Sequence, residues 1–217
     1  MMKSMKLGLK LLRYAWGIKT TLLSGGIFFL LGLLSFTMSV QTWYLGGYLL
    51  MVLAVYPAQL LSSLTVSNLV QTSPWKKALQ TSVPTALTAG AFVLTYGGVL
   101  IISLLRLNAR PEMREDMVMI LVLFTFEIFL IMTYYGIAYK TYVLGTALFI
   151  IVFVIGSSVI QIGAALGVFR GVSVFVAACS GFAAMLLGSA VQYGLSLMLY
   201  KRALSKNAQY PGLRKYI

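Results

Sequence analysis

The sequence predicts an all-α integral membrane protein, with an N-terminal interfacial amphipathic helix followed by six transmembrane helices. Of the 217 residues, 60% are hydrophobic and only 10% are charged, whereas about one quarter of a soluble domain is charged. The apolar residues form six long runs, each near the roughly 20 residues that a helix needs to cross the hydrocarbon. Basic residues lie between the runs, where they report orientation. The net charge of +13 therefore indicates membrane topology, and we expect no nucleic-acid partner.

Residues 1–19 are predicted to form the interfacial helix. At helical spacing, its basic face carries Lys3, Lys6, Lys10 and Arg13, and its apolar face carries Met5, Leu9, Leu12 and Trp16. This pattern is typical of a helix that lies in the membrane interface and turns its basic face toward anionic lipid headgroups. The alternative is an amphipathic helix that packs on a protein partner.

The six transmembrane helices occupy residues 20–200. We expect them at Thr21–Val40, Trp43–Val66, Val83–Leu105, Met117–Tyr139, Thr141–Phe169 and Val172–Tyr200. The last two runs are longer than a bilayer requires, which predicts tilt, a break or a projecting end.

Charge predicts how the chain is oriented. Most of the 17 Lys and Arg residues fall on the side that holds both termini, including the basic tail 201–217, and the positive-inside rule makes that side cytosolic. We therefore expect a multi-pass protein of the cell membrane with cytosolic N- and C-termini. The other side has one substantial loop, 106–116, in which Pro111 and three following acids suit the start of the fourth helix.

Small residues recur at helix-packing spacing in the last two runs. Gly163 and Gly167 form a GxxxG pair, and a second stripe consists of Ser180, Ala184 and Gly188. Small side chains let helix backbones approach closely in a membrane. We expect the last two helices to pack against each other or against a second copy.

Glu127 is the ionisable residue that lies deep in a predicted span. A charged group there costs at least a few kcal/mol, so such a residue usually faces the protein interior or a wet cavity. In the functional interpretation it lines a transport path or couples transport to protons. In the other it is a protonated, hydrogen-bonded packing residue or a partner of Gln161, Gln192 or a tyrosine on another helix. The sequence pattern supports both interpretations equally.

Much catalytic chemistry is excluded by composition. The chain has no histidine, one cysteine (Cys179) and four acidic residues, so ordinary metal sites and His-based acid/base sites are not expected. No P-loop is present. We predict no catalytic residue, no metal site and no enzymatic activity in this chain.

The loop between the second and third spans is predicted to contain a short cytosolic helix over residues 73–80. Ser73 suits the cap and Pro74 the first helical position. The remaining helical residues would be Trp75, Lys76, Lys77, Ala78, Leu79 and Gln80. The alternative is a connecting turn whose two lysines only set topology.

This layout resembles the small permease subunits of type-2 ATP-binding-cassette exporters, which pair with a separate ATPase chain. In that family the loop often reads Leu-Pro-x-Ser-Arg-x-x-Ile before a lysine that opens the third span, and it docks on the ATPase as a coupling helix. Here the segment from Ser73 to Leu79 stands in its place, without the Leu-Pro. The resemblance implies ATPase-coupling roles for Ser73, Pro74, Trp75, Lys76, Lys77 and Leu79.

The same resemblance implies a permease dimer, most simply a homodimer, and an ATPase that carries ATP and magnesium, with no cofactor in this chain. It also implies a transport path, for which Glu127, Tyr134 and Tyr135 are the candidate lining residues. The expected function is export of hydrophobic or amphipathic peptides or antibiotics. The alternatives are a non-transporting accessory or assembly protein of the membrane and a secondary transporter.

Overall fold

The computed structural model describes residues 2–15, 17–38, 43–65, 72–138 and 140–201. Over this part of the chain the structure is helical, and six segments are long and apolar enough to cross a membrane. These segments are Ile18–Ser35, Tyr44–Leu61, Lys76–Ala109, Pro111–Ala138, Val143–Ala165 and Val174–Leu199. The six predicted helical spans are therefore confirmed. The expected span ends at Val40, Val66 and Tyr139, the residue Trp16 and the tail beyond Lys201 lie outside the described residues.

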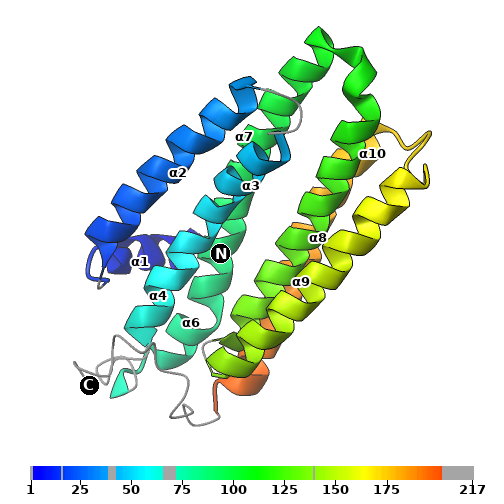
Figure 1. The fold of residues 1–217 in the computed structure, drawn as a ribbon. Helices are drawn as coiled ribbons and strands as arrows, with labels where there is room; N and C mark the ends of the chain where they lie inside the picture. The colour runs from blue at the N-terminus through cyan, green and yellow to red at the C-terminus, as the bar shows by residue number, and fades with distance from the viewer. Residues whose placement is uncertain (1, 16, 39–42, 66–71, 139, 202–217) are drawn as a thin grey trace.

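The helices form two groups that lie side by side (Figure 1). The first group contains α1 (Met2–Leu12), α2 (Ile18–Met38), α3 (Trp43–Val52), η1 (Leu53–Val55), α4 (Tyr56–Thr65), α6 (Lys76–Gln80) and α7 (Ser82–Ala109). The second group contains η2 (Pro111–Met113), α8 (Arg114–Ala138), α9 (Tyr142–Ala165) and α10 (Val174–Leu199). α8 packs against both α9 and α10, and α7 packs against α10, so α7 joins the two groups.

The core lies where α7, α8 and α10 meet. Its fully buried side chains include Phe92 and Tyr96 of α7 and Phe124, Ile128 and Met132 of α8. By contrast, only 6% of the α2 span and 6% of the α9 span are buried. These two helices are therefore peripheral, and their exposed apolar side chains suit contact with lipid tails.

The second span is broken into three helical pieces. α3 ends at Val52, the 3-10 turn η1 covers Leu53–Val55, and α4 begins at Tyr56. Pro57 explains the break, because proline has no N–H to donate to the carbonyl of Leu53 and its ring crowds that carbonyl. The N–H of Tyr56 bonds to the Leu53 oxygen instead, which is the tighter 3-10 pattern.

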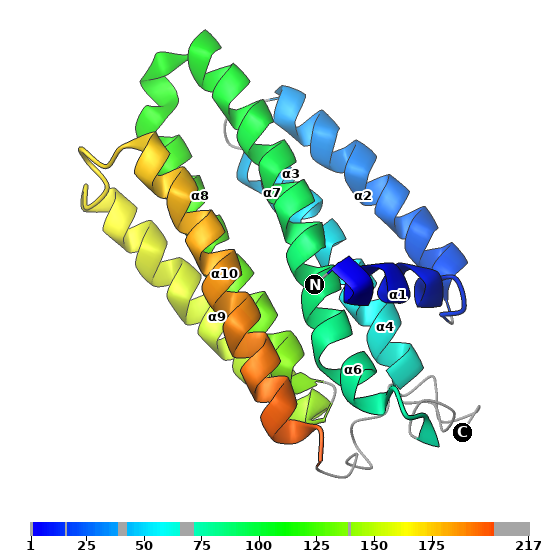
Figure 2. The ribbon, with the colours of Figure 1, turned by 180° about the vertical axis from the view of Figure 1, so that it is seen from behind.

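The N-terminal helix α1 runs across α4 and α7 rather than along them (Figure 2). The side of α1 that packs on the bundle carries Leu7, Leu11 and Leu12, while Leu9, on the face predicted to meet the membrane, is 53% exposed. Gly8 lies on the side of α1 that contacts α7. A Cβ atom at Gly8 would lie 2.6 Å from Leu87 Cδ1 and 2.9 Å from Val83 Cγ1, so a larger residue would require these side chains to shift.

The basic face of α1 points away from these contacts. Lys6, Lys10 and Arg13 are exposed, as expected for side chains that reach toward headgroups or solvent. The side chains of Lys3 and Met5 lie outside the described part of the structure.

The expected GxxxG pair in the fifth span is not formed. α9 ends at Ala165, and Gly167 lies beyond it with φ of +74°. The Val168 N–H bonds to the Gly163 carbonyl at 3.0 Å and the Gly167 N–H to the Ala164 carbonyl at 2.9 Å. These two bonds define a Schellman motif, whose left-handed residue is usually glycine. Gly167 therefore ends the helix and is not a packing residue within it.

The stripe on α10 faces α8, so the expected tight contact between α9 and α10 is replaced by contact through α8. The alternative, contact with a second copy, stays a prediction. Thr125 and Ser180 hydroxyls lie 2.9 Å apart. Ala184 is buried, and a Cβ atom at Gly188 would lie 3.0 Å from the Met132 sulfur. Small residues thus allow α10 to approach α8 closely.

The connection between the third and fourth spans is more helical than predicted. α7 continues to Ala109, so Arg110 alone separates it from η2 within the expected 106–116 loop. Pro111 begins η2, and Glu115 and Asp116 occupy the first turn of α8. Acids in a first helical turn are stabilised by the positive end of the helix dipole.

Candidate functional site

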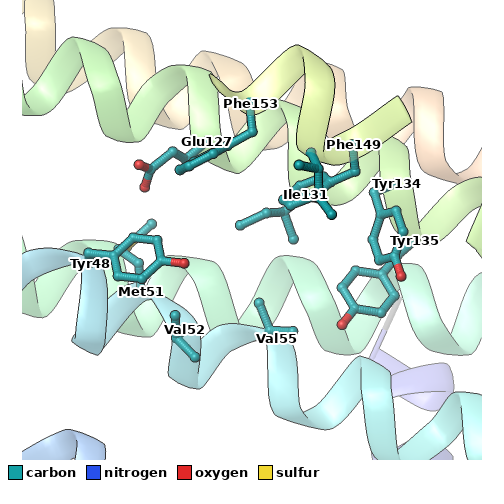
Figure 3. Close-up of a pocket in the computed structure, with 11 residues that line it drawn as sticks. Tyr48, Met51, Val52, Val55, Glu127, Ile131, Tyr134, Tyr135, Phe149 and Phe153 are labelled. Carbon is teal, nitrogen blue, oxygen red and sulfur yellow. The ribbon is translucent and has the colours of Figure 1, made fainter. Parts of the chain in front are cut away.

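A cavity of about 410 Å³ lies between the second span, α8 and α9. Its lining is mostly apolar and aromatic (Figure 3). The second span contributes Tyr48, Met51, Val52 and Val55; α8 contributes Glu127, Ile131, Tyr134 and Tyr135; and α9 contributes Phe149, Ile150 and Phe153.

The three predicted lining residues share one face of α8. Tyr134 and Tyr135 follow Glu127 by seven and eight positions, a spacing that places all three on one side of a helix. Figure 3 shows the Glu127 carboxylate at one end of the set, on the side of Tyr48, and the two tyrosines at the other end. The structure therefore brings the three residues together around one cavity.

Glu127 is 1% exposed, and its carboxylate is hydrogen-bonded to a residue of the second span. The Tyr44 hydroxyl donates a hydrogen bond of 2.9 Å to Glu127 Oε1. The Tyr44 ring is stacked with Phe124, with ring centroids 6.1 Å apart. The hydrogen bond fixes the carboxylate and links α3 to α8. Glu127 therefore lines the cavity and is also the hydrogen-bonded partner of another helix.

Aromatic contacts order the opposite end of the cavity. The Tyr134 ring lies 5.1 Å from the Tyr135 ring and 5.1 Å from the Phe149 ring. The Tyr134 hydroxyl and Thr146 Oγ1 are 3.1 Å apart. These contacts join α8 to α9 and hold the phenol groups in place.

Sequence reasoning missed the lining residues of the second span and of α9. A usable signal was present, because Tyr48, Val52 and Val55 follow the spacing of one helical face, as do Phe149 and Phe153. In helices that are apolar all round, however, this spacing does not show which face turns inward.

The second notable feature is the segment that leads into α6. The predicted helix over 73–80 is shorter, because α6 begins at Lys76. Residues 73–76 form a turn, in which the Lys76 N–H bonds to the Ser73 carbonyl at 3.0 Å and the Trp75 N–H bonds to Ser73 Oγ at 3.1 Å. Pro74 therefore occupies the second position of a β-turn, where its fixed φ is favoured, and not the first position of the helix.

α6 has one buried face and one exposed face. Leu79 is 6% exposed and packs with Leu61 of α4 and Val83 of α7, beside the leucines of α1. Trp75 is 62% exposed, and Lys77 is also exposed. An exposed tryptophan beside exposed basic groups is typical of a surface that meets lipid or protein.

Tyr200, just beyond α10, connects α6 with the second helix group. Lys77 Nζ lies 5.6 Å from the centroid of the Tyr200 ring, within the range of a cation–π contact. Lys140 Nζ donates to the Tyr200 carbonyl at 3.5 Å. Lys140 is buried, and burial lowers the pKa of its ammonium group, with Lys76 lowering it further.

The acidic side chains of the sequence lie away from α6. The four acids of the sequence are Glu112, Glu115, Asp116 and Glu127, which lie at the connection between α7 and α8 or in the cavity. Within the described residues, no group of three or more His, Cys, Asp or Glu side chains could hold a metal ion. The cavity brings one carboxylate, that of Glu127, together with phenol groups and apolar side chains.

The fold defines this chain as a multi-pass helical membrane protein. No protein-family model matches it, and no curated protein or solved structure matches it either.

Proposed function

We propose that this chain is the transmembrane permease subunit of an ATP-driven exporter, coupled through α6 to a separate ATPase. The observation that carries the proposal is the position of α6. Its exposed side, with Trp75 and Lys77, is free to meet a partner, while Leu79 packs on α4 and α7. Lys77 also reaches Tyr200 beyond α10. Displacement of α6 would therefore act on both helix groups.

The cavity lies between the two helix groups, where a displacement of α6 could change access to it. It is bounded by the second span from the first helix group and by α8 and α9 from the second. Tilting one group against the other would change access to the cavity, as in other transporters that alternate between two sides. In this proposal the ATPase moves α6, and the movement of α6 opens or closes the cavity that holds the cargo.

The proposal includes the membrane topology. The basic end with α6 and both termini would be cytosolic in the cell membrane, following the positive-inside rule. The ATPase would bind ATP and magnesium, and this chain would hold no cofactor. The exposed apolar faces of α2 and α9 leave room for a second copy in a homodimer as well as for lipid.

A secondary transporter is the second candidate. Glu127 favours it, because a buried acid in a cavity is the usual coupling residue of such transporters. A non-transporting accessory protein would need neither the cavity nor the exposed side of α6. The identity of the partner protein distinguishes the exporter from the secondary transporter and the accessory protein, since only the exporter requires a P-loop ATPase.

The test is purification of the full chain from its own host, followed by identification of co-purifying proteins and measurement of ATP hydrolysis. We expect an ATPase to co-purify and its activity to rise when the permease is present. Truncation of an exposed interface tryptophan typically removes about 2 kcal/mol or more of binding energy. We therefore expect Trp75→Ala combined with Lys77→Glu to lower complex formation at least about tenfold.

Lys19→Glu is the matched control, because Lys19 is exposed at the start of α2 and α2 does not pack on α6. It should leave complex formation and ATP hydrolysis unchanged, and all variants should insert normally. Equal behaviour of the α6 variant and the wild type, or the lack of an ATPase partner, would overturn the exporter proposal.

A further inference from the structure

The size of the cavity restricts what it can hold. A volume of about 410 Å³ falls in the range of sites for small organic ligands, roughly 300–1,000 Å³. The lining combines five aromatic rings with aliphatic side chains, and the polar groups lie at its two ends. This shape suits a compact, largely apolar molecule and not an extended peptide.

The charge of the cavity restricts the ligand further. Glu127 is the acid in the lining, and none of the lining residues is basic. Within the described part of the structure, the Lys and Arg side chains all lie outside this lining. A carboxylate in an apolar environment is strongly disfavoured without a counter-charge, and the Tyr44 hydroxyl supplies one hydrogen bond but no charge.

The aromatic rings favour the same sign of ligand charge. Tyr48 and Phe153 line the cavity together with Glu127, and Figure 3 shows both rings in the same part of the cavity as the acid. The faces of aromatic rings attract cations, most strongly where water is excluded. An anion would meet both the carboxylate and the negative ring faces.

We propose that this cavity binds a small hydrophobic monocation, whose charged centre pairs with Glu127 and whose apolar groups contact the rings of α8 and α9. The inference deepens the proposed function, on which it rests for the role of the ligand as cargo. Binding itself requires only this chain. Failure of binding and failure of ATPase coupling are therefore separate results.

The experiment compares two probes of similar shape and opposite charge. The full chain is reconstituted in phosphatidylcholine nanodiscs, and binding of radiolabelled tetraphenylphosphonium is measured by equilibrium dialysis, with empty nanodiscs to correct for partition into lipid. Each ion is dialysed in a separate experiment, and we expect saturable binding of the phosphonium and no saturable binding of tetraphenylborate. Saturable binding of both ions alike, or no saturable binding, would overturn the proposal, because the cavity would then be an apolar space for lipid tails.

Variants test whether Glu127 supplies the selectivity. Glu127→Gln should weaken phosphonium binding at least about tenfold, since it removes the counter-charge and keeps the shape. Glu112→Gln removes an exposed acid of η2 and should leave binding unchanged. Size-exclusion and thermal unfolding check that both variants fold, and the comparison of the two probes on the wild type is decisive if Glu127→Gln does not. Unchanged binding by folded Glu127→Gln would refute the assigned contact.

Discussion

Replacing Gly181 by alanine tests how closely α10 approaches α7. Gly181 is buried in α10, and an added Cβ atom would overlap the ring and hydroxyl of Tyr96. Tyr96 cannot move aside easily, because its ring is fully buried and its hydroxyl donates to the Ala178 carbonyl at 3.1 Å. We therefore expect Gly181→Ala to destabilise the protein.

The magnitude follows from two terms. Overpacking in a filled core costs about 1–3 kcal/mol, and displacing the Tyr96 hydroxyl from its acceptor costs about 1 kcal/mol more. Alanine also gains up to about 1 kcal/mol over glycine in helix propensity. The free energy of unfolding should therefore fall by about 1–3 kcal/mol in total.

Gly194 provides a matched control on the same helix. It has no atom within 4 Å of an added Cβ, so Gly194→Ala should receive only the gain in propensity. Unfolding in mixed micelles, followed by circular dichroism as a denaturing detergent is added, should separate the two variants by about 2–4 kcal/mol. Equal stability of the two variants would refute the packing of Tyr96 against Gly181.

Two further predictions concern the ends of helices. Gly167→Ala should destabilise the protein by about 1 kcal/mol, because alanine disfavours the left-handed conformation of a helix cap, while Gly163→Ala should be nearly neutral in the same detergent unfolding assay. Lys140 has a lowered pKa in the folded protein, so stability should rise as the pH increases from that folded pKa toward the ordinary value of about 10.4. Lys140→Met should reduce this alkaline rise in unfolding curves measured at several pH values.

Each of these two predictions has a contrary outcome. Equal destabilisation by Gly163→Ala and Gly167→Ala would support the GxxxG packing motif and contradict the helix cap. An alkaline rise in Lys140→Met as large as in the wild type would show that other groups cause it. Lys201→Met is the control for the second case, because Lys201 is exposed.

The spans were predictable because the bilayer requires length and apolarity, and both are local properties of the sequence. The clustering of Glu127, Tyr134 and Tyr135 was also predictable, since residues seven and eight positions apart share a helical face. Residues on one helix can be placed together without knowledge of its neighbours. The lining from α3 and α9 required tertiary packing, which apolar periodicity does not encode in helices that are hydrophobic all round.

Three features of the helices were not predicted correctly from the sequence: the end of α9, the break in the second span and the contacts of α1. Gly163 and Gly167 fit a packing motif in sequence, yet the chain leaves the helix before the second glycine. Pro57 was a visible signal for the break in the second span. For α1, the contact of Leu7 and Leu11 with the bundle was not predicted, because it depends on the neighbouring helices α4 and α7. The break at Pro57 and the helix end at Gly167 follow from local backbone chemistry, whereas the contacts of α1 follow from tertiary packing.

Lys77, which lies over the Tyr200 ring, makes α6 sensitive to salt and to anionic lipid. Lys77 is exposed, so its attraction to an anionic neighbour acts across solvent and weakens over a Debye length of about 8 Å at physiological ionic strength. Each basic group near an anionic leaflet contributes about 1 kcal/mol. Ionic strength and the fraction of acidic lipid should therefore change the force on α6 through Lys77.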